Sequence, residues 1–210
     1  MIVRLTGSLL FMLITSAVLF SQPAPPAANS LVDLQELIAD LVVDMPYATP
    51  HNFTGETLYQ ANRAFLVEPA AHALATAAVL LRAQGYRLKI WDAYRPLSVQ
   101  RKLWDKNPDR NFVAHPDTGS RHNRGASVDL TLLTIDGKEV AMPSSYDEFG
   151  EKARAVNPGL QEPVKTHLQI LQNAMQTSGF KLLASEWWHF DFPGWKSFPL
   201  LDISLNDLAK

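Results

Sequence analysis

The sequence predicts an α+β domain in which a small, mostly antiparallel central sheet is flanked by helices. Three observations lead to this fold class. Residues 86–92 largely alternate between the two sides of an extended chain, which is typical of a strand. The pair Asp136-Gly137 joins two further extended stretches, and this dipeptide tolerates the positive φ angles of a tight hairpin turn. Residues 68–84 are rich in alanine and leucine and are followed by Gly85, which predicts a long helix with a C-terminal glycine.

The remaining elements follow from local patterns along the chain. Apolar residues at helical spacing predict a short helix at residues 31–38, and residues 41–45 then form an extended piece. Pro96 sets off a helix at residues 97–106. An apolar stripe predicts a later helix that begins near residue 164 and ends at Gly179. The other expected elements are a loop at 47–55, hairpin strands at 127–135 and 138–142, and short strands at 180–183 and 188–192.

The composition predicts one folded domain over residues 29–210. Of the 210 residues, 47% are hydrophobic and 19% are charged, which is enough apolar surface to form a sizeable core. The 19 basic and 21 acidic residues nearly cancel, so the chain lacks the basic excess of a nucleic-acid-binding protein. The absence of cysteine excludes disulfides, iron–sulfur clusters and cysteine nucleophiles. Any metal must therefore be held by histidine, aspartate or glutamate.

Residues 1–28 are predicted to be a signal peptide and linker that lie outside the folded domain. Arg4 precedes an apolar run at residues 8–20, whose 13 residues are fewer than the ~20 that a membrane-spanning helix needs. Small and proline-rich residues follow at 21–30. We therefore expect an exported protein, periplasmic or extracellular, with no stable membrane span after cleavage. The alternative is an uncleaved membrane anchor, because no A-x-A triplet ends the apolar run.

Two imidazoles and one carboxylate form a candidate metal site. His122 lies in a loop, Asp129 follows it on a strand, and His189 comes 60 residues after Asp129 on a strand that can lie beside the first. An ionised aspartate in an apolar strand is costly to bury unless a positive group meets it. Three such ligands leave one tetrahedral position for water, which is the arrangement of a catalytic zinc. The alternative is a buried ion pair between Asp129 and either Arg121 or Arg124.

Glu186 is the expected general base of this site. It precedes His189 by three residues, so on a straight strand the two side chains would point to opposite faces. They converge only if Glu186 belongs to the turn before the strand, or if a β-bulge lies near Trp187. A carboxylate within reach of a metal-bound water takes its proton during attack on a carbonyl, and then returns the proton to the leaving amine.

These residues fall into a pattern that resembles the zinc D-alanyl-D-alanine metallopeptidase family, which includes VanY-type carboxypeptidases and has a Hedgehog-like fold. The pattern is S-x-H-x-x-G-x-x-x-D at 120–129 together with E-x-x-H at 186–189. Further segments look specifically like the VanX-type D-alanyl-D-alanine dipeptidases. They are Y-A-T at 47–49, N-F-T-G at 52–55, W-D-A-Y-R-P at 91–96 and E-W-W-H at 186–189.

The resemblance implies an α+β zinc domain with one Zn²⁺ per subunit and a role for eight residues. The three implied zinc ligands are His122, Asp129 and His189. Glu186 is implied as the catalytic base, and Arg95 as the charge that stabilises the tetrahedral oxyanion. Ser120 is implied near the carboxylate of the substrate, and Tyr47 and Asp147 near its free ammonium group.

Three of these residues have a structural alternative. Arg95 could instead form a salt bridge with Asp92. Tyr47 could be a phenol of the core, and Asp147 could be the N-cap of a helix at residues 148–155.

The leading hypothesis is an exported zinc dipeptidase that hydrolyses D-alanyl-D-alanine to two D-alanines. Its partner is then a small D-amino-acid dipeptide of the kind that cell-wall synthesis and degradation use. The enzymatic alternative is a D,D-carboxypeptidase or an endopeptidase that acts on peptidoglycan stem peptides. The non-enzymatic alternative is a module that keeps zinc structurally or binds cell-wall peptides. A Glu186 carboxylate turned away from the metal pocket would favour that binding module.

Overall fold

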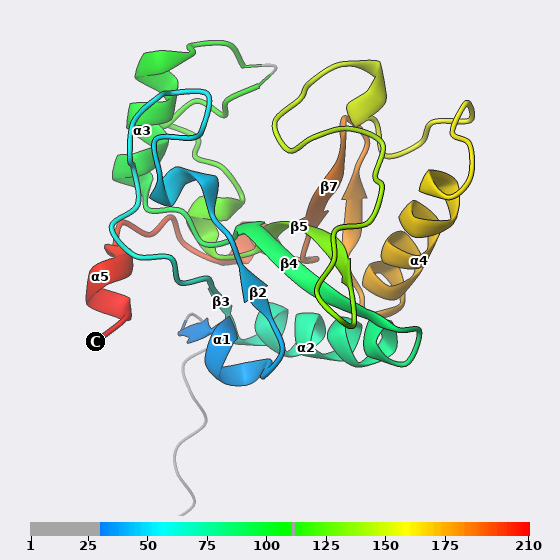
Figure 1. Ribbon diagram of the computed structural model, residues 1–210. Helices are drawn as coiled ribbons and strands as arrows, with labels where there is room; N and C mark the ends of the chain where they lie inside the picture. Colours follow the sequence, from blue (N-terminus) through cyan, green and yellow to red (C-terminus); the bar gives the residue numbers. More distant parts are fainter. Residues whose placement is uncertain (1–29, 111) are drawn as a thin grey trace, which may run out of the picture.

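The computed structural model describes residues 30–110 and 112–210 (Figure 1). The predicted signal peptide and linker, residues 1–28, lie outside these described residues. Within the described ranges, no helix is both long enough and apolar enough to cross a membrane.

A five-stranded mixed sheet forms the centre of the fold, with the strand order β2-β4-β5-β7-β6. Its strands are β2 (Val42–Val43), β4 (Tyr86–Asp92), β5 (Ser127–Thr134), β6 (Lys181–Leu183) and β7 (Glu186–Asp191). The β2–β4 pair is parallel, whereas the β4–β5, β5–β7 and β6–β7 pairs are antiparallel. The predicted α+β class with a mostly antiparallel sheet is therefore confirmed, and the parallel edge strand is an addition to it.

Two long helices build the core against this sheet (Figure 1). α2 (Glu68–Arg82) packs on α4 (Val164–Thr177), and both helices contact strands of the sheet. The buried side chains of each helix recur three or four residues apart, so each helix presents one apolar face. Strand β5 contributes Val128, Leu130 and Leu132, which alternation places on the face opposite Asp129.

The N-terminal part of the described chain differs from the predicted helix at residues 31–38. Its first residues form β1 (Leu31–Asp33), which pairs antiparallel with β3 (Phe65–Val67), and only then does α1 (Leu34–Leu37) begin. The Asp33 side chain accepts a hydrogen bond from the backbone N–H of Gln35 and so caps the helix. Pairing with a distant strand has overridden the local helical spacing.

The predicted hairpin forms its turn but not its second strand. Gly137 adopts a φ of 88°, as the tight turn requires, yet residues 138–142 contribute a single bridge, Leu133 to Glu139. The carbonyl of Ala141 instead accepts a hydrogen bond from Nδ1 of His167 on α4, at 2.9 Å. The strand prediction for residues 138–142 is therefore wrong, since only one bridge forms there.

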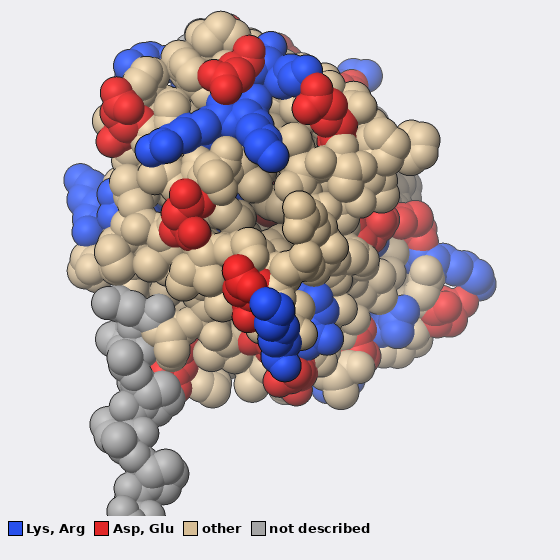
Figure 2. All heavy atoms as spheres, turned by 90° about the vertical axis from the view of Figure 1, so that its left-hand side faces the viewer, with Lys and Arg blue, Asp and Glu red and all other residues tan. Residues whose placement is uncertain are grey.

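Helix α3 (Leu97–Lys106) lies apart from α2 and α4, on the same side of the molecule as the short C-terminal helix α5 (Leu205–Leu208) (Figure 1). The C-terminal segment fixes the start of α3, since Asp202 Oδ1 accepts the backbone N–H of Ser98 at 2.8 Å. The face of the molecule on this side carries basic and acidic side chains interspersed with uncharged surface (Figure 2). The charges of this face are therefore mixed in sign, in line with the near-balanced composition.

Candidate metal centre and active site

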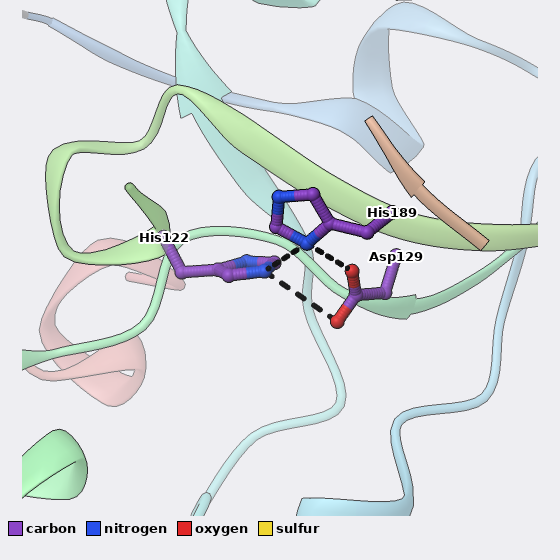
Figure 3. A group of neighbouring side chains, drawn as sticks. All are labelled: His122, Asp129 and His189. Atoms are coloured by element: carbon purple, nitrogen blue, oxygen red, sulfur yellow. Dashed lines mark hydrogen bonds and ion pairs between the residues drawn. The ribbon is translucent and has the colours of Figure 1, made fainter. Parts of the chain in front are cut away.

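Three side chains meet in one cluster at the centre of the sheet (Figure 3). Asp129 on β5 and His189 on β7 are register partners, so their side chains leave the same face of the sheet. His122 comes from a 3₁₀ turn, His122–Arg124, that directly precedes β5. Gly125 ends this turn at a φ of 62°, and a Cβ there would lie 2.7 Å from the Leu31 side chain. Only glycine therefore allows the turn to deliver His122 to the strand pair.

The ligand atoms of the cluster lie close to one another, at or slightly below the spacing of donors around a tetrahedral metal ion. Nε2 of His122 lies 3.2 Å from Nδ1 of His189 and 3.4 Å from Oδ2 of Asp129. Nδ1 of His189 lies 2.9 Å from Oδ1 of Asp129. Zinc–ligand bonds of about 2.0–2.2 Å in a tetrahedron set neighbouring donors about 3.3–3.6 Å apart. The donor set therefore fits a single divalent ion that contacts all three side chains.

The second nitrogen of each imidazole has a partner that fixes the ring. Nδ1 of His122 faces the carbonyl of Ala93 at 2.7 Å, so this nitrogen is the donor and Nε2 is left for a metal. Nε2 of His189 donates to Oδ1 of Asp191 at 2.9 Å, which leaves Nδ1 for a metal. Asp191 in turn forms an ion pair with Arg121. Both rings are thus held in the tautomer and orientation of a metal ligand.

The electrostatics of the cluster favour positive charge. Burial alone would lower the pKa of His189, but the carboxylates of Asp129 and Asp191 raise it to about 10. Burial opposes the ionisation of Asp129, yet its attraction to His122 and His189 outweighs this and holds the pKa of Asp129 far below its ordinary value. A divalent cation supplies positive charge in place of the proton on His189. Metal and proton therefore compete for this site, and metal affinity rises with pH.

The carboxylate of Glu186 reaches this cluster. Its Oε2 lies 3.8 Å from Nδ1 of His189. On β6, Leu182 pairs with Phe190 and the next residue, Leu183, pairs with Glu186, so β7 carries three unmatched residues between these partners. This irregularity brings Glu186 to the same face as His189 despite the odd offset, as convergence required. Burial raises the pKa of Glu186, against the opposing effect of His189, and so strengthens the carboxylate as a proton acceptor.

The guanidinium of Arg95 is buried and held from two sides. Its Nε and Nη2 donate to Oδ2 of Asp92 at 3.0 and 2.6 Å, and its Nη1 donates to Oε1 of Gln100 at 2.8 Å. Burial alone would lower the pKa of Arg95, but Asp92 holds it well above its ordinary value. The salt bridge to Asp92, considered above as an alternative to a functional role, is present. It leaves Arg95 in the wall of the pocket described below.

The remaining predicted residues also contribute hydrogen bonds near the site. The hydroxyl of Tyr47, which is fully buried, donates to Oδ2 of Asp147 at 2.8 Å. Burial, reinforced by the charge of Asp129, raises the pKa of Asp147 to about 7. Asp147 is not a helix N-cap, because residues 148–155 form only a short 3₁₀ turn. Ser120 Oγ accepts the backbone N–H of His122 at 3.2 Å.

One cavity of about 620 Å³ brings together all the side chains that the sequence singled out. The residues that share its wall are Tyr47, Arg95, Ser120, His122, Asp129, Asp147, Glu186 and His189. Aromatic side chains, including Phe112, Phe149 and Trp195, complete the lining. A second, more open cavity of about 730 Å³ shares Phe53 and Asp147 with it and includes none of the three metal-ligand candidates.

Some contacts of the site were not predicted. Tyr146 donates its hydroxyl to Oδ2 of Asp129 at 3.1 Å, and Asp191 holds His189. A signal for Asp191 existed, because a residue two positions after His189 on a strand lies on the same face. The alternative ion pair of Asp129 with an arginine is wrong, since Arg121 pairs with Asp191 and Arg124 contacts a backbone carbonyl.

The Asp191 contact makes a testable prediction about metal affinity. We expect Asp191→Asn to weaken zinc binding about 10- to 100-fold, because it loses the carboxylate that orients His189 and raises its basicity. Competition with a chromogenic chelator measures the Kd. Asp40→Asn is the matched control, since Asp40 also pairs with an arginine, Arg82, but far along the chain from the cluster. Equal affinities of the two variants would contradict the role of Asp191.

The site consists of two buried histidines and the carboxylate of Asp129, with the carboxylate of Glu186 beside them and a cavity in front. This arrangement is typical of metal-dependent hydrolases that bind a single ion. The family model described as D-ala-D-ala dipeptidase, Peptidase_M15, matches residues 27–200. The chain belongs to this family, which confirms the resemblance seen in its motifs.

Individual relatives cover most of the chain. The D-alanyl-D-alanine dipeptidase of Escherichia coli (strain K12) is 37% identical over 173 residues, which is 82% of this chain and 90% of that protein. The protein of the same name from Enterococcus faecalis (strain ATCC 700802 / V583) is 31% identical over 77% of this chain and 91% of its own length. That from Streptomyces coelicolor is 30% identical over 75% and 88%.

Proposed function

We propose that the protein is a zinc dipeptidase that hydrolyses D-alanyl-D-alanine to two molecules of D-alanine. The observation that carries this proposal is the position of the Glu186 carboxylate. Its Oε2 lies 3.8 Å from Nδ1 of His189, one of the three candidate ligand atoms, and Glu186 lines the same cavity. A carboxylate in that position is what a hydrolase needs and what a structural metal site does not use. The names of the curated relatives support the choice of substrate.

The residues that would hold zinc are His122, Asp129 and His189, whose spacing fits its bond lengths. Zinc, when bound there, supplies a Lewis acid that polarises a carbonyl oxygen and makes water more acidic. The protein contributes the rigid ring orientations and the negative charge of Asp129, which offsets part of the charge of the ion.

Glu186 moves the proton in the proposed reaction. Its carboxylate accepts a proton from the attacking water and donates it to the amine that leaves when the peptide bond breaks. Burial raises the pKa of Glu186, which makes it a better acceptor than an exposed carboxylate. The same residue thus serves both proton-transfer steps without any further titratable group.

Arg95 stabilises the oxyanion of the tetrahedral intermediate. A guanidinium has five N–H groups, and the bonds to Asp92 and Gln100 use three of them. The hydroxyl of Tyr59 also interacts with the guanidinium, so at least one N–H is left for a substrate oxygen. Because the group is already held in place, no reorganisation is needed when negative charge develops.

The cavity wall offers polar groups to both charged ends of a zwitterion. Asp147 and Tyr47 offer oxygen atoms to an ammonium group, and Ser120 offers a hydroxyl to a carboxylate. Without substrate, the pKa of the Asp147 carboxyl is about 7. An ammonium group beside it would lower this pKa and favour the ionised carboxylate. Recognition of both ends selects a dipeptide over a longer peptide, because the nitrogen of a longer peptide that would lie beside Asp147 is an uncharged amide and its ammonium group is further away.

The test compares D-alanyl-D-alanine with its N-acetyl derivative. We expect D-alanine release from the free dipeptide to exceed release from the acetylated one by at least about 100-fold in kcat/KM, because the acetylated compound leaves Asp147 without its cationic partner. Asp147→Asn should reduce this preference. Comparable turnover of both compounds would instead favour the carboxypeptidase or endopeptidase alternative.

We also propose that the protein is exported, on the strength of residues 1–28 alone. Expression of the full chain in bacteria should yield a product whose N-terminus, read by mass spectrometry, lies between residues 20 and 30. A product in the cytosolic fraction that retains residue 1 would contradict export, and a full-length product in the membrane fraction would indicate the uncleaved anchor.

A further inference from the structure

Helix α3 buries a glutamine where its pattern calls for an apolar residue. Gln100 is fully buried, as are its helix neighbours Val99 and Leu103. Burying an amide is costly unless its hydrogen-bonding groups find partners, whereas a leucine would extend the apolar face of the helix. The contacts of Gln100 therefore have to account for its presence.

Both halves of the Gln100 amide are used, and both point to the active site. Oε1 accepts from Nη1 of Arg95 at 2.8 Å, and Nε2 donates to the carbonyl of Ala114 at 2.8 Å. The chemistry of the partners fixes this orientation, since a guanidinium only donates and a backbone carbonyl only accepts. Ala114 lines the same cavity as Arg95. The amide thus links the guanidinium to the backbone of another residue of the cavity wall.

Asp92 alone does not fix the plane of the guanidinium. The bonds from Nε and Nη2 of Arg95 end on the same oxygen atom, Oδ2, about which the group is able to pivot. Oδ1 of Asp92 is occupied by the hydroxyl of Tyr59 at 2.7 Å. The ring centroid of Tyr47 lies 5.6 Å from Cζ of Arg95, and the bond from Nη1 to Gln100 adds a directional contact at a terminal nitrogen that Asp92 does not hold.

We propose that Gln100 is a positioning residue for hydrolysis, which orients the guanidinium of Arg95 toward the substrate. The proposal rests on the proposed function, in which Arg95 stabilises the oxyanion. Gln100 is not among the described residues that line the cavity, so it acts through Arg95 rather than by touching substrate. Its effect belongs to the transition state and therefore to kcat.

The experiment is a double-mutant cycle with Gln100→Leu and Arg95→Lys. We expect Gln100→Leu to lower kcat for D-alanyl-D-alanine about 10-fold, with KM changed less than about 2-fold and zinc content unchanged. In the Arg95→Lys background the same substitution should change kcat by less than about 2-fold, because no guanidinium is left to orient. Gln100→Met, which keeps the length of the side chain, should behave like Gln100→Leu.

The matched control is Gln172→Leu. Gln172 lies on α4, and its Nε2 also donates to an alanine carbonyl, that of Ala155, at 2.7 Å. Among the described residues, Gln172 forms no hydrogen bond with an arginine. We expect this variant to lose thermal stability but to keep the wild-type kcat.

Several results would overturn the positioning role. They are wild-type kcat in Gln100→Leu, an equal fold-loss in the Arg95→Lys background, an equal loss of kcat in Gln172→Leu, or failure of both Gln100 variants to fold. The last result would show that the glutamine serves the fold. A wild-type protein that releases no D-alanine would instead overturn the proposed function, so the two failures are distinguishable.

Discussion

Glu186→Gln is expected to lower kcat for D-alanyl-D-alanine about 100- to 10,000-fold while zinc remains bound. Glutamine has nearly the same shape as glutamate but accepts no proton at neutral pH, so the attacking water loses its base and the leaving amine loses its acid. The three metal-ligand candidates are unchanged in this variant. D-Alanine release, coupled to D-amino-acid oxidase, measures kcat, and elemental analysis measures zinc.

The control for this prediction is Glu151→Gln, whose side chain is exposed and outside the cavity. It should leave both kcat and zinc content at wild-type values. Undiminished D-alanine release from Glu186→Gln would discard the mechanism proposed for this residue. Loss of zinc together with activity would show that Glu186 helps to hold the metal.

Asp129→Asn is expected to abolish zinc binding and, with it, hydrolysis. Asparagine removes the only carboxylate among the three ligand candidates and leaves two buried imidazoles without their shared anion. We expect added zinc to raise the Tm of the wild type, since a ligand that binds only the folded state stabilises it, and to leave the Tm of the variant unchanged. A variant that keeps one zinc per chain would contradict the assignment of Asp129 as a ligand.

The pH dependence of the zinc-free wild type gives an independent check on this cluster. The pKa of His189 rises from an ordinary value of 6.5 to about 10 in the folded protein. A raised folded-state pKa stabilises the fold fully below pH 6.5, and this contribution is lost as the pH rises toward 10. The free energy of unfolding should therefore fall over this interval without zinc and fall less with zinc, which replaces the proton. If the free energy of unfolding depended on pH identically with and without zinc, zinc and the His189 proton would not be competing for this site.

The sequence was sufficient to select the residues of the site because their chemistry is unusual for their surroundings. Asp129 is a carboxylate in an apolar strand, and His189 lies on a segment that also reads as a strand. Pairing of the two strands then follows from sheet geometry, and the register found, Asp129 opposite His189, brings the two side chains together. The odd offset of Glu186 left two arrangements open, a turn position before the strand or a β-bulge near Trp187, and the structure has Glu186 within β7 beside an irregular pairing with β6.

The supporting contacts were not predictable in this way, because they depend on how distant elements pack. The helical pattern places Gln100 beside apolar residues but does not show which groups its amide contacts, and nothing local distinguishes Tyr146 from any loop tyrosine. The same limit applies to the fold. The β1–β3 pair joins residues more than thirty positions apart, and residues 138–142 lose their strand to a hydrogen bond from a helix histidine.

The irregular pairing of β7 also has a mechanical consequence. A regular strand advances about 3.3 Å per residue, so side chains on one face are about 7 Å or about 13 Å apart along it. With three unmatched residues, Glu186 and His189 share a face at a shorter separation, and three peptide units join them. Any displacement of this strand carries both groups together. Movement of β7 relative to its neighbours should thus leave the alignment of proton acceptor and ligand largely unchanged.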